Sequence, residues 1–336
     1  MRRRDFVTLL GGTVAAWPLA VQAQKLAQTR RVSVLLGLTE NDPLQNARLK
    51  AFRLGMRDLE WIEGRNIQVE YRFAGANLAL INQHVAELIR SAPDAIVANS
   101  TPVLAALRTA TSTIPIVFVI VNDPVGQGFI PNLTHPGGNV TGFSFIEPEI
   151  LGKWINLLRD VKPDLSRVAL MFNPDTAPYY DRYVRSYKSS QLSVAVDPMH
   201  VRSVAEVDLA IAELGREPRV ALIAASDPYI LTVREAILQA ADQHRIPLIS
   251  AYKQFVAEGS LMSYGPDTAD LFRRSSSYVD RILKGESAGN LPVQSPEKFE
   301  LVVNLKAAKV LGLSVRESFL LLADEVIEAR MSAIGT

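Results

Sequence analysis

The sequence predicts an α/β protein built from two Rossmann-like lobes, each with a parallel sheet. Short apolar runs rich in β-branched residues alternate with longer amphipathic segments along residues 31–264, a pattern typical of parallel strands covered by helices. The alternation pauses near Gly142–Pro148 and then restarts, which indicates a second lobe. A chain of 336 residues is long enough for about two domains.

The first half of the chain supplies a βαβαβαβ series, which predicts helices on both faces of its sheet. Its clearest strand is PIVFVIV, an almost unbroken β-branched run of the kind that is buried on both faces. We expect the first helix to bury a stripe made of Leu44, Ala47, Ala51, Leu54 and Leu59. The expected strands are 31–38, 67–73, 95–100 and 115–121, and the expected helices are 43–59, 78–91 and 102–111.

The second half repeats the series and then adds a C-terminal extension. Its expected strands are 167–173, 194–201, 219–226, 247–252 and 259–265. Its expected helices are 148–161, 178–191, 204–214, 228–244 and 268–283. Residues 289–304 then read as an extended crossing, and we expect helices at 305–311 and 318–329.

Composition excludes several classes of function. The chain has no cysteine and only four histidines, without the spacing of metal ligands, so we expect no metal and no cofactor. The formal net charge is +1 and no basic block is present, so we expect no nucleic-acid partner. The glycine pair Gly126 and Gly128 is followed by Pro131 where a dinucleotide site needs glycine, and Ser144 lacks the second glycine of a nucleophile elbow. These absences predict a protein that is not an enzyme.

The N-terminus resembles an export signal. Residues 1–23 combine a basic start, a modest apolar stretch and a small-residue end. Arg3 and Arg4, followed by Phe6, resemble the twin-arginine motif, although a general secretory signal is the alternative. We expect cleavage after Ala23 and a mature protein in the periplasm. No later segment has the roughly 18 apolar residues of a membrane span.

Polar residues collect where predicted strands end. In VANSTP, IVNDP, MFNPDTAP and IAASDP, a buried strand runs into small polar residues and a proline. Helix capping alone explains each case, since Thr101 and Asp227 precede prolines that suit a first helical turn. Together, however, the four lie at the edge of a parallel sheet where α/β proteins bind ligands.

These strand ends supply the candidate ligand-binding residues. Helix N-termini present free N–H groups that favour a carboxylate, so we expect Ser100 and Thr101 to bind one. We expect Asp123 and Asp227 to face a cationic or hydroxyl part of the ligand. An aromatic wall is typical of a small-molecule cleft, and the candidates for it are Tyr179, Tyr180, Tyr229 and Tyr264.

Four long stretches resemble one family. LEWIEGRNIQVEYRFA, TSTIPIVFVIVNDPVGQGFIPNLTHPGGNVTGFS, LMSYGPDTADLFRRSSSYVDRILKG and LPVQSPEKFELVVNLKAAKVLGL resemble ABC-transporter substrate-binding proteins of the periplasmic-binding-protein type I class. The likeness spans about residues 30–330 and the signal peptide. It implies two lobes that close around a solute by a hinge, and delivery of that solute to the permease subunits of an ABC importer. Some members are similar to receptors for aromatic amino acids.

The resemblance also assigns residues and boundaries. Ser100 and Thr101 match the strand-end pair that faces the ligand, with Asn99 beside them. Asp123 matches the acidic rim residue and Asp227 its counterpart in the second lobe. Hinge crossings are implied near Gly142–Phe145, near Ser263–Gly265 and in LPVQSP. Lobe 1 would then comprise 30–143 with about 265–290, and lobe 2 would comprise 144–264 with about 291–332. The aromatic run in NPDTAPYYDRY departs from the family pattern and favours a ring-bearing solute.

Two alternatives share this fold prediction. The chain could be a secreted sensor subunit that binds a solute and docks on a receptor. It could also be an extracytoplasmic enzyme, although no nucleophile and base are paired in the sequence. Fold alone does not separate these functions.

Overall fold

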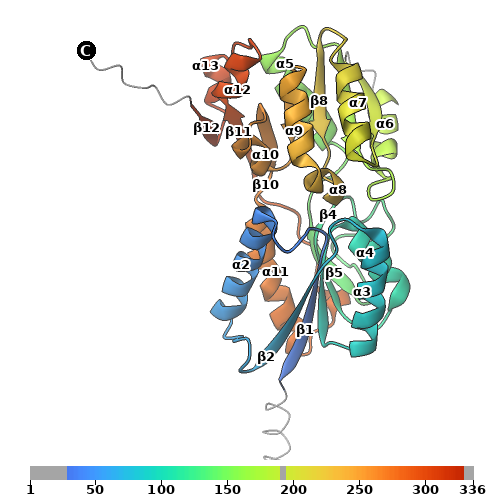
Figure 1. The fold of residues 1–336 in the computed structure, drawn as a ribbon. Helices are drawn as coiled ribbons and strands as arrows, with labels where there is room; N and C mark the ends of the chain where they lie inside the picture. Colours follow the sequence, from blue (N-terminus) through green and yellow to red (C-terminus); the bar gives the residue numbers. More distant parts are fainter. Residues whose placement is uncertain (1–28, 190–193, 329–336) are drawn as a thin grey trace, which may run out of the picture.

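The computed structural model describes residues 29–189 and 194–328. The predicted signal peptide, residues 1–23, lies outside the described residues. The described chain forms two α/β lobes, one above the other in Figure 1, and the predicted fold class is confirmed. Within these two ranges, no helix has the length and apolar character needed to span a bilayer.

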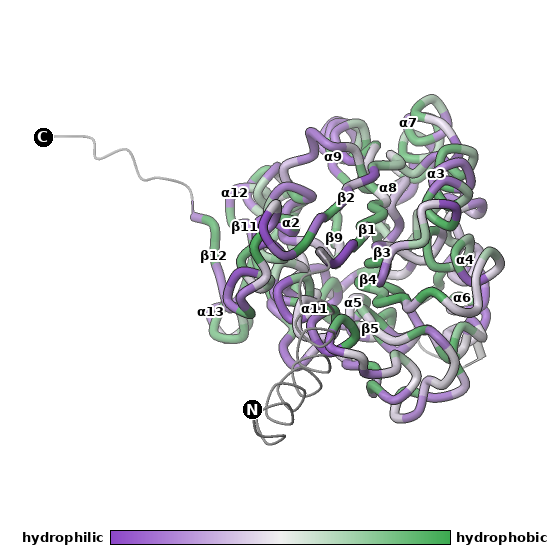
Figure 2. The backbone as a smooth tube through the Cα atoms, turned by 90° about the horizontal axis from the view of Figure 1, so that it is seen from below, coloured by the Kyte–Doolittle hydropathy of each residue, from purple (hydrophilic) through white to green (hydrophobic). Residues whose placement is uncertain are grey.

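Lobe 1 is a five-stranded parallel sheet in the order β2-β1-β3-β4-β5. Helices α2 and α11 lie on one side of the strands, and α3 and α4 lie on the other (Figures 1 and 2). The strands are β1 (Arg30–Leu36), β2 (Ile67–Phe73), β3 (Ala95–Asn99), β4 (Ile116–Val121) and β5 (Val140–Ser144). The helices are α2 (Pro43–Asp58), α3 (Leu78–Ser91), α4 (Thr101–Ala110), α11 (Thr268–Leu283) and the 3-10 turn η1 (Ala288–Asn290).

The strands of lobe 1 are buried on both faces because helices cover both. In β3, Val97 belongs to the core shared with α2, whereas its neighbours Ile96 and Ala98 belong to the core under α3 and α4. Successive side chains of a strand point to opposite faces, so a continuous apolar run is what this sheet requires. The same reasoning predicted β4 from its sequence.

Lobe 2 is a seven-stranded sheet in the order β12-β11-β10-β9-β8-β6-β7. Its strands are β6 (Arg167–Phe172), β7 (Ala195–His200), β8 (Val220–Ala224), β9 (Leu248–Ser250), β10 (Met262–Pro266), β11 (Phe299–Asn304) and β12 (Glu325–Ile327). Its helices are α5 (Ile150–Val161), α6 (Tyr180–Ser189), α7 (Val204–Leu214), α8 (Pro228–Thr232), α9 (Arg234–Gln243), α10 (Lys253–Ala257), α12 (Leu305–Val310) and α13 (Glu317–Leu320). One pairing, β10 with β11, is antiparallel, so this sheet is mixed rather than purely parallel.

The chain passes between the lobes three times. It leaves lobe 1 after β5, returns between β10 and α11, and leaves again between η1 and β11. Two of the crossings pair side by side, since the backbone N–H of Gln294 donates to the carbonyl of Gly142 at 2.9 Å and that of Ser144 donates to the carbonyl of Gln294, also at 2.9 Å. These crossings bring the carboxyl ends of both sheets to one interface.

Three details differ from the sequence predictions. The expected helix at 318–329 is instead the short α13 and the strand β12, because Glu325–Ile327 pairs with the edge strand β11. The expected helix at 228–244 is divided at Val233 into α8 and α9. The predicted buried stripe of α2 is wrong: Leu54 is 41% exposed, and the buried residues are Gln45, Arg48, Leu49, Phe52, Gly55 and Met56.

Candidate functional site

The two lobes enclose a small cavity where their strands end. Its volume is about 20 Å³, which is room for about one water molecule. Lobe 1 lines it with Leu38, Arg48, Asn99, Ser100, Thr101, Ile120 and Asn122, and lobe 2 lines it with Tyr179, Ser226, Pro228, Leu231 and Tyr252. Each lobe thus contributes one wall, and any solute held here would contact both lobes.

Arg48 is the one charged residue among those that line the cavity. It lies on α2, where it is 1% exposed, and its Nε and Nη2 atoms donate no hydrogen bond within the described chain. Its guanidinium carbon lies 5.6 Å from the ring centroid of Tyr252. Burial lowers the pKa of Arg48, while Tyr252 and Asp42 oppose that shift. An arginine nevertheless stays protonated in proteins, so the wall carries a buried positive charge with unused donors.

The turn from β3 into α4 presents polar groups to the same space. Ser100 occupies the N-cap position with φ 89° and ψ 155°, but its side chain makes no capping hydrogen bond. Its Oγ atom is buried and has no hydrogen-bond partner in the described residues. Sequence reasoning put the cap at Thr101, which is instead the first residue of α4. The Ser100 hydroxyl and the N-terminus of α4 can therefore donate hydrogen bonds to an anion.

Asn122 joins the two lobes directly. Its Nδ2 atom donates to Tyr179 Oη at 2.7 Å and to the carbonyl of Ser226 at 3.0 Å. Its Oδ1 atom is buried and accepts no hydrogen bond from the residues described. The backbone before it is strained, since Ile120 has φ 61°, a value that a β-branched residue rarely adopts. A register shift between Val119 and Val121 accompanies this strain.

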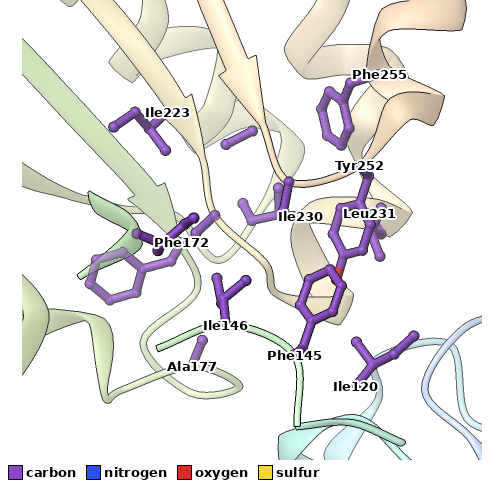
Figure 3. Packing of buried hydrophobic residues seen from close by; sticks show 14 of the residues in the cluster. Ile120, Phe145, Ile146, Phe172, Ala177, Ile223, Ile230, Leu231, Tyr252 and Phe255 are labelled. Carbon is purple, nitrogen blue, oxygen red and sulfur yellow. The ribbon is translucent and has the colours of Figure 1, made fainter. Parts of the chain in front are cut away.

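Aromatic and apolar side chains complete the wall of lobe 2. Tyr252 stacks on Phe145, with ring centroids 5.4 Å apart, and Figure 3 shows Ile120 and Leu231 beside this pair. The hydroxyl of Tyr252 lies 2.7 Å from Ser226 Oγ. Tyr180 lies behind the wall, where its hydroxyl accepts from the N–H of Ser226 at 2.9 Å. Burial raises the pKa of both tyrosines, so their hydroxyls remain protonated.

The structure brings some of the predicted residues together at the cavity and leaves others outside it. Asn99, Ser100, Thr101 and Tyr179 line the cavity, whereas Asp123, Tyr180, Asp227, Tyr229 and Tyr264 do not. Tyr264 instead lies at the crossings, where it stacks on Phe299 with ring centroids 5.4 Å apart and borders a surface groove of about 300 Å³. Tyr229 is partly buried within α8.

The two predicted acidic residues have other roles in this structure. Asp227 caps α8: its Oδ1 accepts from Tyr229 N at 2.9 Å and from Thr176 Oγ1 at 2.6 Å, and its Oδ2 accepts from Asn173 N at 2.8 Å. Burial raises its pKa to about 6. Asp123 accepts from Gly126 N and forms an ion pair with Arg182 of lobe 2. This geometry favours the capping alternative for Asp227 and an interlobe contact for Asp123.

Sequence reasoning missed Arg48, which the spacing of α2 could have revealed. Gln45, Arg48, Leu49, Phe52 and Met56 follow one helical face at intervals of three and four residues. No group of histidine, cysteine or acidic residues in the described ranges could hold a metal ion.

Comparisons with known proteins identify the class of protein that this fold and cavity define. Residues 32–327 match the ABC transporter substrate binding protein family. The tyrosine-binding protein of Clostridioides difficile strain R20291 is 26% identical over 279 residues, which cover 82% of this chain and 79% of that protein.

Two solved structures share the fold over 89% of this chain and the whole of theirs. A conserved domain protein from Vibrio cholerae is 28% identical with a TM-score of 0.82. An ABC domain from Streptococcus pneumoniae in complex with L-Trp is 20% identical with a TM-score of 0.81.

The chain belongs to the ABC transporter substrate-binding protein family. It is a protein that captures a small solute for ABC import. Its relatives are substrate-binding proteins rather than enzymes, and members of the family are generally extracytoplasmic and work with an ABC transporter.

Proposed function

We propose that this protein captures a small, ring-bearing carboxylate in the interlobe cavity and delivers it to the permease subunits of an ABC importer. The observation that carries the proposal is Arg48, a buried guanidinium with unused donors at the cavity wall. A buried charge whose donors are only partly used is costly. A carboxylate on the solute would remove that cost, because guanidinium and carboxylate match in a bidentate geometry.

The neighbours of Arg48 supply further donors for the same anion. The Ser100 hydroxyl and the first N–H groups of α4 lie on the same lobe and line the same cavity. We assign Ser100, Thr101 and Asn99 to the polar end of the solute. The α4 terminus adds a partial positive charge, which favours an anion.

The wall of lobe 2 suits a ring. Tyr179 and Tyr252 supply aromatic surface there, and Leu231 supplies apolar surface. The tyrosine-binding protein and the L-Trp complex among the relatives support a ring-bearing solute. Because the cavity has only about 20 Å³, the lobes must part to admit such a solute, and they would then remain slightly further apart around it.

Isothermal titration calorimetry with a panel of aromatic acids tests this proposal. We expect at least one ring-bearing carboxylate to bind. The substitution Arg48→Gln should weaken its affinity by about 2–5 kcal/mol, as for a charge pair buried at an interface. The control is Arg57→Gln, an exposed arginine on the same helix, which should leave affinity unchanged.

Thermal unfolding of both variants separates binding from folding. Arg48→Gln should change the melting temperature little, because it removes the desolvation cost of a buried charge together with the favourable interactions of that charge with Tyr252 and Asp42. Binding of the panel by Arg48→Gln at the parent's affinity would refute the assignment of Arg48. A panel without any binder would refute the solute class.

We further propose that the protein is exported to the periplasm and cleaved near Ala23. The basic start, apolar stretch and small-residue end of residues 1–23 support this, as does the extracytoplasmic location general to the family. Mass spectrometry of the natural product should give an N-terminus near Gln24. A full-length chain in the cytoplasm would contradict it.

A further inference from the structure

The charges around the interlobe cavity are unbalanced. Arg48 contributes a positive charge, and no acidic residue is among the described residues that line the cavity. Three aspartates are near enough to be considered as partners for a positively charged group on the solute: Asp42, Asp123 and Asp227. The position and hydrogen bonds of each aspartate decide whether its carboxylate can accept from such a group.

All six carboxylate oxygens of these aspartates already accept hydrogen bonds from the protein. Asp42 caps α2 through Oδ1, which accepts from Leu44 N at 2.9 Å, and its Oδ2 accepts from Arg234 Nη1 at 2.7 Å. Asp227 binds three donors of lobe 2, as described above. Asp123 accepts from Gly126 N through Oδ1 and from Arg182 through Oδ2. None of the three aspartates is among the residues that line the cavity, and each of their oxygens already has a donor from the protein.

The unused polar atoms at the cavity are neutral apart from Arg48. They are the hydroxyl Oγ of Ser100 and the amide Oδ1 of Asn122, both buried and without a partner in the described chain. A neutral hydroxyl on the solute can donate to either atom. An ammonium group would be held by the same neutral acceptors and would also be repelled by the guanidinium of Arg48 in a poorly screened site.

We infer that the solute carries its carboxylate without an ammonium group, so that it is a net anion such as a ring-bearing hydroxy acid or unsubstituted acid. The inference rests on the proposed function, since it refines the solute of the same cavity. A monoanion pairs with Arg48, whereas the ammonium group of a zwitterionic amino acid meets only neutral acceptors among the residues that line the cavity. The ammonium group and the Arg48 guanidinium, about 6 Å apart at an effective dielectric constant of about 20, repel each other. That repulsion corresponds to a difference in affinity on the order of a hundredfold between the monoanion and the zwitterion.

Matched pairs of ligands test the inference with the unmodified protein. Calorimetry at pH 7 would compare L-tyrosine with 3-(4-hydroxyphenyl)lactate and 3-(4-hydroxyphenyl)propionate, and L-tryptophan with indole-3-lactate and indole-3-propionate. Within each set the ring and the carboxylate are kept and only the α-substituent changes. We expect the acids that lack the amino group to bind at least about thirtyfold more tightly than the amino acid, allowing for partial screening of the repulsion.

A pH series gives a second readout. In the indole set, where the ring does not titrate, raising the pH until the α-amino group loses its proton should improve the affinity of L-tryptophan and leave that of its deaminated partners unchanged. An amino acid that binds within threefold of its deaminated partner, with no gain at high pH, would overturn the inference and leave the proposed function intact. If neither member of any pair binds, the proposed solute class and this inference both fail.

Discussion

Three residues beside the interlobe cavity have positive φ angles although none is glycine. They are Ser100 with φ 89°, Ile120 with φ 61° and Asp123 with φ 39°. Such conformations cost of order 1–3 kcal/mol each and cluster at functional sites. Ser100 and Ile120 line the cavity, and Asp123 makes the contact with Arg182 across it. The strain therefore lies where the two lobes meet.

At the residue scale, Ser100 allows strain and ligand contact to be separated. Ser100→Gly should stabilise the protein by about 1 kcal/mol, because glycine adopts positive φ without steric cost. It should also weaken solute affinity by about tenfold to a hundredfold, since a hydrogen bond to a charged group contributes about 1.5–3 kcal/mol. Urea unfolding and calorimetry measure the two effects.

Ser100→Ala is the matched control, because it removes the hydroxyl and keeps the strained backbone. It should lose affinity to the same extent and show no gain in stability. Equal affinity for the parent and both variants would exclude the Ser100 hydroxyl as a ligand contact.

A local rule placed several candidate residues near the ends of buried strands. Asn99, Ser100, Thr101 and Tyr179 line the cavity, whereas Asp123 and Asp227, chosen by the same rule, do not, and binding of the solute by any of them stays a prediction. Arg48 obeys no such rule, since an arginine within an amphipathic helix is usually exposed. Its guanidinium lies instead between the lobes, 5.6 Å from the ring centroid of Tyr252. That contact joins residues more than 200 positions apart, so the spacing of α2 can indicate that Arg48 is buried but not what it contacts.

At the scale of elements, Asp227 connects α8 to the turn between β6 and α6. Asp227→Asn keeps an acceptor for Tyr229 and Thr176 but turns an N–H toward the N–H of Asn173. We expect a loss of about 1–3 kcal/mol in stability, the cost of an unsatisfied buried group. We expect solute affinity within twofold of the parent, because Asp227 does not line the cavity.

The pKa of Asp227 gives this loss a pH dependence. Burial raises the pKa from 3.8 to about 6, so between these values the folded parent holds a proton that the unfolded chain has released. The free energy of unfolding of the parent therefore falls as the pH rises through this window, and that of the asparagine variant lacks this contribution. The substitution should cost more at pH 4.5 than at pH 7 in urea unfolding. A cost that is the same at both pH values would show that the pKa is not raised.

The sequence predicted those helices and strands whose structure depends on their own residues rather than on a distant partner. The apolar runs of β3, β4, β6 and β8 each form the expected strand, because burial between helices demands continuous apolar residues. The C-terminal region differs, since Glu325–Ile327 becomes a strand only through pairing with β11. The break between α8 and α9 likewise has no proline or glycine at Val233 to signal it.

At the scale of the whole molecule, ion pairs and hydrogen bonds between described side chains hold the lobes together. Arg234 at the start of α9 binds Asp42 of lobe 1 at 2.7 Å, and both side chains are largely buried. Arg182 of α6 pairs with Asp123 and also donates to the carbonyl of Gly126. Asn122 binds Tyr179 and Ser226 between these two ion pairs. Each of these contacts joins one lobe to the other, so a movement that parts the lobes and opens the site must break them.

The double substitution Arg182→Ala and Arg234→Ala should therefore favour the open arrangement. Small-angle X-ray scattering without added solute should give a larger radius of gyration than for the parent, and saturation with a binding solute should reduce it. Solute affinity should also fall, because fewer contacts between the lobes would then hold them around the bound solute. The control is Arg273→Ala, which breaks an ion pair with Asp58 inside lobe 1 and should change neither quantity. If the double variant scatters like the parent, the two ion pairs do not hold the lobes closed, and closure must then depend on the solute and on Asn122.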